Sequence, residues 1–159
     1  MAIWQFGFSI IPEEAILKRK SINQFDKKFS DHEDSISWKG YCLSQFSVDK
    51  ISGILKQAKS WSDNIKQFGD TDETCIELFY AQNTLLEISI RLDLRSLTLN
   101  ILAAVIDFIK DNKALILTEE GILLRPVVED VVKKIKKSDA YCFVKNPEEF
   151  ISSFFNNQQ

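Results

Sequence analysis

The sequence predicts a single α+β domain over residues 1–159, with a mostly antiparallel sheet and helices packed against it. Three observations support this class. The length of 159 residues fits one domain. The 45% hydrophobic and 27% charged residues, with few Gly and Pro, are typical of a globular protein. Segments with strand periodicity also alternate with segments of helical periodicity, and one strand pair is joined by a very short loop, which requires antiparallel strands.

The clearest pair of strands is a hairpin formed by TCIELFY and LLEISIRLDL. A three-residue loop at 81–83 places Leu78 opposite Leu86 and so gives the hairpin one apolar face, whereas a two-residue loop would set Leu78 against Glu87. We therefore predict the three-residue loop. Further strands are predicted at 2–11, at 36–43, on both sides of the Glu-Gly turn in KALILTEEGILLRP, and at 141–144.

Helical periodicity and capping residues predict the remaining elements. Ser47, Ser96 and Asn146 are the expected N-caps of three helices. The helix after Ser96 is apolar on nearly every side, which predicts that it is the central helix of the core. The predicted helices span 13–20, 48–59, 97–111, 126–137 and 147 onward, with a loop or frayed turn at 21–35 and a turn-rich connection at 61–73.

The net charge of −3 argues against a nucleic-acid-binding protein, and the charge is unevenly distributed. Residues 63–93 contain seven acidic residues against two basic ones, a net charge of −5, while residues 110–137 have a net charge of +2. An acidic region attracts cationic partners. The three cysteines show no metal-site spacing, and no signal peptide or membrane span is recognised, which predicts a reduced, cytoplasmic protein without membrane attachment.

The strand at 85–94 raises the main question about function, because one of its faces carries Glu87, Ser89, Arg91 and Asp93. In the predicted register Glu73 lies opposite Arg91, and Glu77 lies opposite Glu87. The second pair is unusual, since like charges directly opposite each other are destabilising. Three explanations remain open: solvent screens the pair, the pair binds a cationic partner, or the two carboxylates are an acid/base couple.

Other candidate chemistry is weak in this sequence. His32 is the only histidine and lies among consecutive acidic residues, so no convergent metal site is predicted. The five scattered glycines form no phosphate-binding motif, and no cofactor is expected. The basic run KKIKK at 133–137 could indicate nucleic-acid binding, but its position at a helix C-terminus favours an interaction with the helix dipole.

One resemblance adds to this interpretation. The segment FGDTDETCIELFYAQNTLLEISIRLDLRSL at 68–97, together with FVKNPEEF at 143–150, resembles a pattern in small bacterial immunity proteins of polymorphic-toxin or contact-dependent growth inhibition systems. The resemblance implies an inhibitor without catalysis of its own. Such a protein binds one cognate toxin domain, often a basic nuclease, and blocks its active site or substrate groove.

The acidic region suits that role, because complementary charge gives fast and specific association. Two alternatives stay open: a small cytosolic enzyme that uses Glu77 and Glu87 with Arg91 in a sheet-surface pocket, and a structural or adaptor subunit. The oligomeric state is left open. The predicted partner-binding residues are Asp70, Asp72, Glu73, Glu77, Glu87 and Arg91.

Overall fold

The computed structural model describes residues 1–18 and 36–156 and contains a seven-stranded antiparallel sheet in the order β2-β3-β4-β5-β1-β6-β7. This confirms the predicted α+β class with an antiparallel sheet. The strands are β1 (Gln5–Pro12), β2 (Gln57–Ala58), β3 (Ile65–Gly69), β4 (Cys75–Ala81), β5 (Thr84–Asp93), β6 (Ala114–Thr118) and β7 (Leu123–Leu124). The helices are α1 (Glu13–Leu17), α2 (Gln45–Ser52), α3 (Leu99–Asp111), α4 (Val128–Lys136), α5 (Asp139–Lys145) and α6 (Pro147–Asn156).

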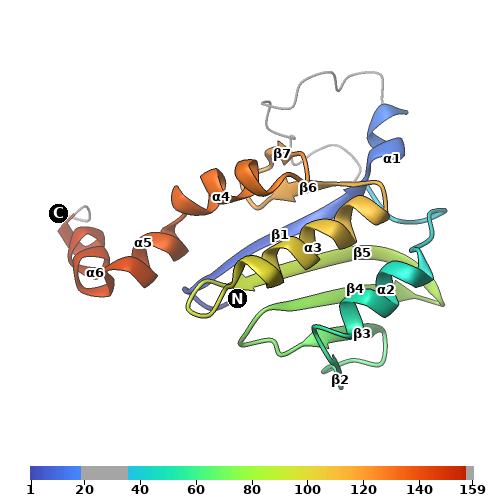
Figure 1. Cartoon of the computed structure of the whole chain (residues 1–159), viewed down its shortest axis with the longest axis horizontal. Helices are drawn as coiled ribbons and strands as arrows, with labels where there is room; N and C mark the ends of the chain where they lie inside the picture. The colour runs from blue at the N-terminus through green and yellow to red at the C-terminus, as the bar shows by residue number, and fades with distance from the viewer. Residues whose placement is uncertain (19–35, 157–159) are drawn as a thin grey trace.

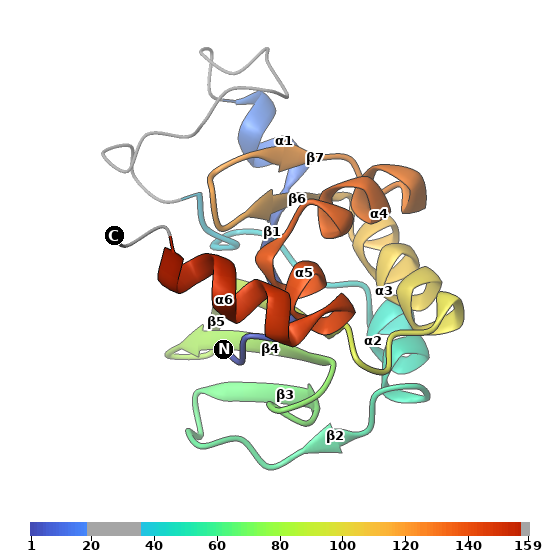
Figure 2. The same ribbon diagram turned by 90° about the vertical axis from the view of Figure 1, so that its left-hand side faces the viewer.

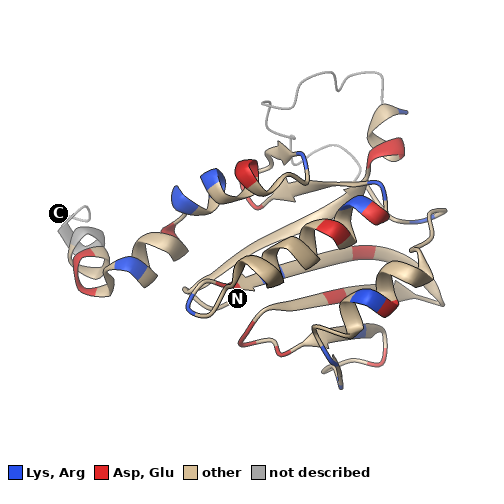
Figure 3. Cartoon of the chain, viewed as in Figure 1, with Lys and Arg blue, Asp and Glu red and all other residues tan. Residues whose placement is uncertain are grey.

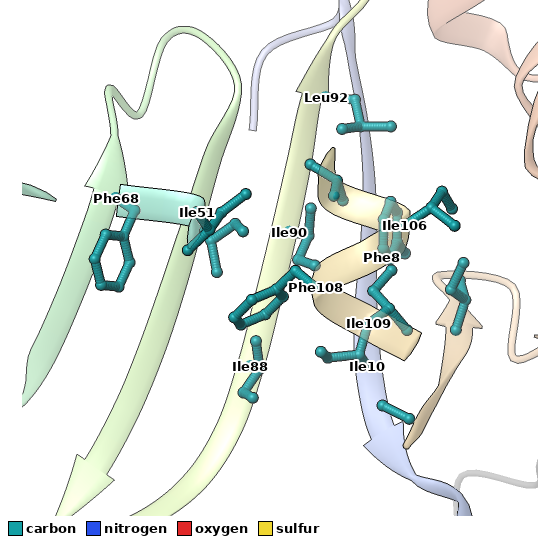
Figure 4. Packing of buried hydrophobic residues seen from close by; sticks show 14 of the residues in the cluster. Phe8, Ile10, Ile51, Phe68, Ile88, Ile90, Leu92, Ile106, Phe108 and Ile109 are labelled. Atoms are coloured by element: carbon teal, nitrogen blue, oxygen red, sulfur yellow. The ribbon is translucent and has the colours of Figure 1, made fainter. Parts of the chain in front are cut away.

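Two helices, α2 and α3, cover one face of the sheet, while α4, α5 and α6 continue from the β7 side past the end of the strands (Figures 1 and 2). The main core lies between the sheet and these two helices. Figure 4 shows Phe8, Ile88 and Ile90 from the sheet facing Ile106 and Phe108 of α3, and all five are buried. Because successive strand residues point to opposite faces, the alternation in β1 and β5 supplies one apolar face of the sheet.

The prediction that the helix at 97–111 is central to the core is confirmed by α3, although α3 has one polar side. Leu102, Val105 and Ile109 of α3 are buried, whereas Asp107 and Lys110 are exposed. Its N-cap is Thr98, whose hydroxyl accepts a hydrogen bond from the backbone N–H of Ile101 at 3.2 Å. The predicted cap at Ser96 was therefore wrong by two positions.

The hairpin is confirmed, but the predicted loop length and register were wrong. The loop has two residues, Gln82 and Asn83, both with positive φ, as in the turns that match strand twist. A bulge at Leu86 then shifts the register, so that Leu78 lies opposite Ile88. A two-residue loop thus keeps the apolar face intact, because the extra residue in β5 compensates for the shorter turn.

The predicted strand at 36–43 does not form. The backbone N–H of Trp38 donates to the carbonyl oxygen of Leu86 at 2.9 Å, and its indole Nε1 donates to the carbonyl oxygen of Ile10 at 2.7 Å. Trp38 is buried. Residues 36–43 are therefore an irregular segment that a buried indole fastens to the sheet, instead of a strand that pairs along its length.

Three further element predictions were wrong or incomplete. The first predicted cap, Ser47, lies inside α2, and Ser44 caps this helix. The helix ends at Ser52, and residues 57–58 of the predicted helix 48–59 form strand β2. The predicted connection at 61–73 contains strand β3. The predicted strand at 141–144 lies within α5, which Ser138 caps by accepting a hydrogen bond from the N–H of Tyr141.

The remaining element predictions agree with the structure. Strands β6 and β7 flank the expected turn, and α1 and α4 lie within the predicted helices. The side chain of Asn146 accepts a hydrogen bond from the N–H of Glu149, which confirms it as the cap of α6. The predicted loop at 21–35, with His32, lies outside the described residues.

Candidate functional site

The loop between β3 and β4, residues 70–73, is the most acidic exposed segment of the predicted site, and we call it the acidic loop. Asp70, Asp72 and Glu73 are all exposed. Figure 3 shows this acidic turn at one end of the sheet. Three of the six predicted partner-binding residues thus lie together on one short surface loop.

The fold of the loop begins at Gly69, whose φ is +81°. A Cβ at this position would lie 2.2 Å from the carbonyl oxygen of Thr74, so only glycine fits without a shift of the backbone. Within the turn, the carboxylate Oδ1 of Asp70 accepts a hydrogen bond from the N–H of Asp72 at 2.9 Å. Asp70 therefore shapes the loop from inside, in the manner of an Asx turn.

Side chains from the start of β1 and from the segment after β5 hold the backbone of the loop in place. Gln5 Nε2 donates to the carbonyl oxygens of Thr71 and Glu73, at 2.8 and 2.7 Å. Trp4 Nε1 and Arg95 Nη2 donate to the carbonyl oxygen of Asp72, at 3.3 and 3.0 Å. The loop is thus fastened through its backbone, and this leaves the side chains of Asp72 and Glu73 at the surface.

Arg95 is itself fixed by two neighbours. Its Nε and Nη2 donate to the two carboxylate oxygens of Asp93, at 2.9 and 2.8 Å, and its guanidinium carbon lies 4.1 Å from the ring centre of Trp4. The side-chain hydrogen bond from Arg95 holds the pKa of the buried Asp93 carboxyl below its usual value. Asp93 is therefore a positioning residue for Arg95, and through it for the acidic loop.

The polar face of the sheet contains a second ion pair, between Arg91 and Glu77. Glu77 is buried, and its Oε1 has no hydrogen-bond partner in the structure. Its opposite neighbours are Ser89 on β5 and Gln67 on β3. Arg91 reaches Glu77 diagonally, because it lies opposite Cys75 on the same strand pair.

The predicted charge pairs across the hairpin were therefore wrong. Glu77 does not lie opposite Glu87, because the bulge places Glu87 opposite Phe79. Glu73 does not lie opposite Arg91 either, because β4 begins at Cys75. No like-charge pair needs an explanation, since the carboxylate of Glu77 is neutralised by a cation on the neighbouring strand.

The structure divides the six predicted residues into three groups. Asp70, Asp72 and Glu73 form the acidic loop, whereas Glu77 and Arg91 pair inside the sheet face. Glu87 is exposed but lies six residues along β5 from Asp93, which corresponds to roughly 20 Å of strand. It does not join the acidic loop.

The geometry also bears on nucleophilic and metal chemistry. Burial raises the pKa of the Cys75 thiol to about 11, so this thiol is protonated at neutral pH and is a poor nucleophile. Within residues 1–18 and 36–156 there is no group of three or more His, Cys, Asp or Glu residues placed to hold a metal ion. Among the helices in those ranges, none combines the length and apolar character needed to cross a bilayer.

A pocket lies away from the acidic loop, between the β6–β7 connection, β7 and α4, and has a volume of about 470 Å³. Four of its lining side chains are cationic and one is acidic, so we call it the basic pocket. Sequence reasoning missed it, because the KKIKK run was attributed to the helix dipole. Its lining residues are Ile122, Leu123, Leu124, Arg125, Asp130, Lys133, Lys134 and Lys137.

Comparison of this chain with protein-family models, with curated proteins and with solved structures gives no match.

Proposed function

We propose that this chain is an immunity protein that binds and neutralises one cognate bacterial toxin domain, with the acidic loop at the centre of the contact and without catalysis of its own. The protein would act in the cytoplasm and block the active site or substrate groove of the toxin. A basic nuclease domain is the partner that best fits the charge of the loop.

The observation that carries this proposal is the fixed geometry of the acidic loop. Gln5, Trp4 and Arg95 hold its backbone, while Asp72 and Glu73 remain exposed. A loop that is ordered before binding loses little conformational entropy when a partner docks. Its negative charge attracts a basic surface and speeds the encounter. The resemblance of residues 68–97 to immunity proteins supports the same role.

The enzyme alternative requires Glu77, Glu87 and Arg91 to share an accessible pocket. Only 1% of the Glu77 side chain is exposed, and one of its oxygens is occupied by Arg91. A substrate therefore cannot reach this carboxylate in the structure. The pocket described above lies beside α4, away from these three residues.

The proposal is tested with the C-terminal domain of the protein encoded beside this gene. Co-expression should rescue cells from that domain, and the two chains should co-purify as a stable complex. The informative variant is Asp72→Asn with Glu73→Gln, which removes two charges without disturbing the loop carbonyls. Its matched control is Asp49→Asn with Asp107→Asn, which removes two exposed charges from α2 and α3 on the helical layer.

The expected result is rescue by the wild type and the control, with weakened rescue by the loop variant. If the wild type neither rescues the cells nor forms a complex, the immunity function is contradicted. If the wild type rescues and both variants rescue equally well, the toxin contact does not depend on the acidic loop.

A further inference from the structure

We infer that the basic pocket binds a small ligand that carries a phosphate group beside an apolar moiety. This site is separate from the acidic loop, and the inference does not depend on the immunity function.

The first argument is the convergence of cations from two segments on one cavity. Lys133, Lys134 and Lys137 come from α4 and its C-cap, and Arg125 comes from the segment after β7. Asp130 is the one acidic lining residue. Glu120, at the edge of the β6–β7 connection, pairs with Lys134 and so holds it in position. The lining of the pocket therefore has a net positive charge, with Lys133 and Lys137 one helical turn apart and exposed.

The helix dipole does not account for this arrangement. Lysines near a helix C-terminus are favoured wherever they point, and Lys136 satisfies that preference as well as its neighbours do. Lys136 does not line the pocket, however, whereas Lys133 and Lys137 do. Some lysines of KKIKK therefore line the cavity and one does not, and the helix dipole does not explain this difference in position. Lys136 is consequently a built-in control.

The volume of the pocket fits a small ligand. Its volume of about 470 Å³ is in the ordinary range for small-molecule sites. Ile122, Leu123 and Leu124 give it an apolar wall next to the ammonium groups. A polymer such as nucleic acid is less suited, because the protein as a whole is negatively charged, at −3.

The cations favour phosphate over carboxylate. Lysine acts as a compact point charge, so several ammonium groups can surround a tetrahedral dianion from different directions. A carboxylate offers two oxygens and one negative charge, whereas a phosphate monoester offers three oxygens and close to two negative charges, so the same cations bind phosphate more strongly. The C-terminal half of α4 offers no free N–H groups to an anion, so the cationic side chains must supply the binding energy. Binding of the phosphate ligand should therefore weaken strongly as the salt concentration rises.

The test is a titration of the isotope-labelled full chain, followed by NMR amide shifts, with ADP, inorganic pyrophosphate and citrate as probes. We expect saturable shifts centred on residues 120–137 with ADP and pyrophosphate. ADP should bind more tightly than pyrophosphate because of the apolar wall, and citrate should bind more weakly than both. The variant Lys133→Gln with Lys137→Gln should weaken ADP binding by about tenfold or more, since two charge-assisted contacts are lost.

The control variant Lys136→Gln should bind ADP within about twofold of the wild type, because it changes the charge of the same run without touching the pocket. All three proteins should give native amide spectra, since the substituted residues are surface lysines. Three results would each overturn the inference: no saturable shift with ADP, citrate binding equal to that of the phosphates, or equal loss of binding in the two variants.

Discussion

At the residue scale, the charged side chains of residues 91–95 (RLDLR) mainly form ion pairs with one another or with neighbouring residues. Arg91 pairs with the buried Glu77, and Arg95 pairs with the buried Asp93. Apart from the exposed Glu87, the charged side chains on the polar face of β5 are thus engaged in ion pairs. The ion pairs differ in quality, because Asp93 accepts several hydrogen bonds whereas Glu77 leaves one oxygen unpaired.

Removing Arg91 should lower the free energy of unfolding, because it leaves the buried Glu77 carboxylate without a cationic partner. We expect Arg91→Met to lower the free energy of unfolding by about 3 kcal/mol, at the low end for a broken buried pair because Arg91 is partly exposed. The double variant Glu77→Leu with Arg91→Met should recover most of that loss, since no buried charge remains. Urea denaturation of both variants measures this. A double variant that is as unstable as Arg91→Met would show that the pair does not act as a unit.

The second pair should give stability a defined pH dependence. Because the folded pKa of Asp93 is lowered, chiefly by its hydrogen bond with Arg95, its stabilisation is fully present above the unfolded pKa of about 3.9 and is lost as the pH falls through the folded pKa. We expect Asp93→Asn to cost about 1–3 kcal/mol at neutral pH.

Denaturation curves of the wild type and Asp93→Asn, measured from neutral pH to about pH 2, follow this difference. The difference in unfolding free energy between the two proteins should narrow as the pH falls through the folded pKa of Asp93. A gap in unfolding free energy that stays constant across the range would mean that Asp93 does not stabilise the fold as an ionised group.

At the element scale, the shape of the acidic loop depends on how β3 ends. We expect Gly69→Ala to destabilise the protein by more than about 2 kcal/mol, because it adds left-handed strain of about 1–2 kcal/mol and a clash with the carbonyl of Thr74. Gly40→Ala is the matched control. Gly40 also has a positive φ, of +87°, but a Cβ there would meet nothing within 4 Å.

Thermal unfolding of the two glycine variants separates strain from the clash. Gly40→Ala should show only the strain, a loss of about 1–2 kcal/mol. Gly69→Ala should lose more stability than Gly40→Ala and should also bind the toxin partner less tightly. Equal stability losses in the two variants would contradict the close approach of Gly69 to the following strand.

The sequence was sufficient for those elements whose signals are local. The β4–β5 hairpin, the buried helix α3 and the cap at Asn146 follow from periodicity and capping chemistry. The hairpin register could not be predicted, because the bulge at Leu86 changes which residues lie opposite each other and no turn or capping residue in the sequence marks it. Likewise, the acidic composition of residues 70–73 was readable, but the burial of Glu77 depends on its pairing across strands.

The ends of elements were less predictable for a related reason. Ser44 and Ser47 are both chemically suitable caps, and only the packed structure selects Ser44. The hydroxyl of Ser47 instead donates to the carbonyl oxygen of Ser44 and accepts from Asn112 of the α3 C-cap. The basic pocket escaped prediction because only the folded chain brings Arg125 and the α4 lysines to the lining of one cavity.

At the scale of the whole molecule, the acidic loop and the basic pocket lie on separate surfaces. The acidic loop joins β3 and β4 (Figure 3), whereas the basic pocket is lined by residues of β7 and α4 at the other edge of the strand order. A partner attracted to one surface is therefore repelled by the other. This arrangement would favour docking of a basic toxin domain at the acidic loop, which the proposed function places at the centre of the contact.

The most direct test of that claim is the association rate constant with the toxin domain, measured by stopped-flow at low and high salt. We predict that Asp72→Asn with Glu73→Gln slows association by about tenfold at low salt and reduces its salt dependence, because exposed charges steer the encounter. Asp49→Asn with Asp107→Asn, which makes the same change in net charge, should have little effect. Equal slowing by both variants, or no slowing by the loop variant, would contradict the claim.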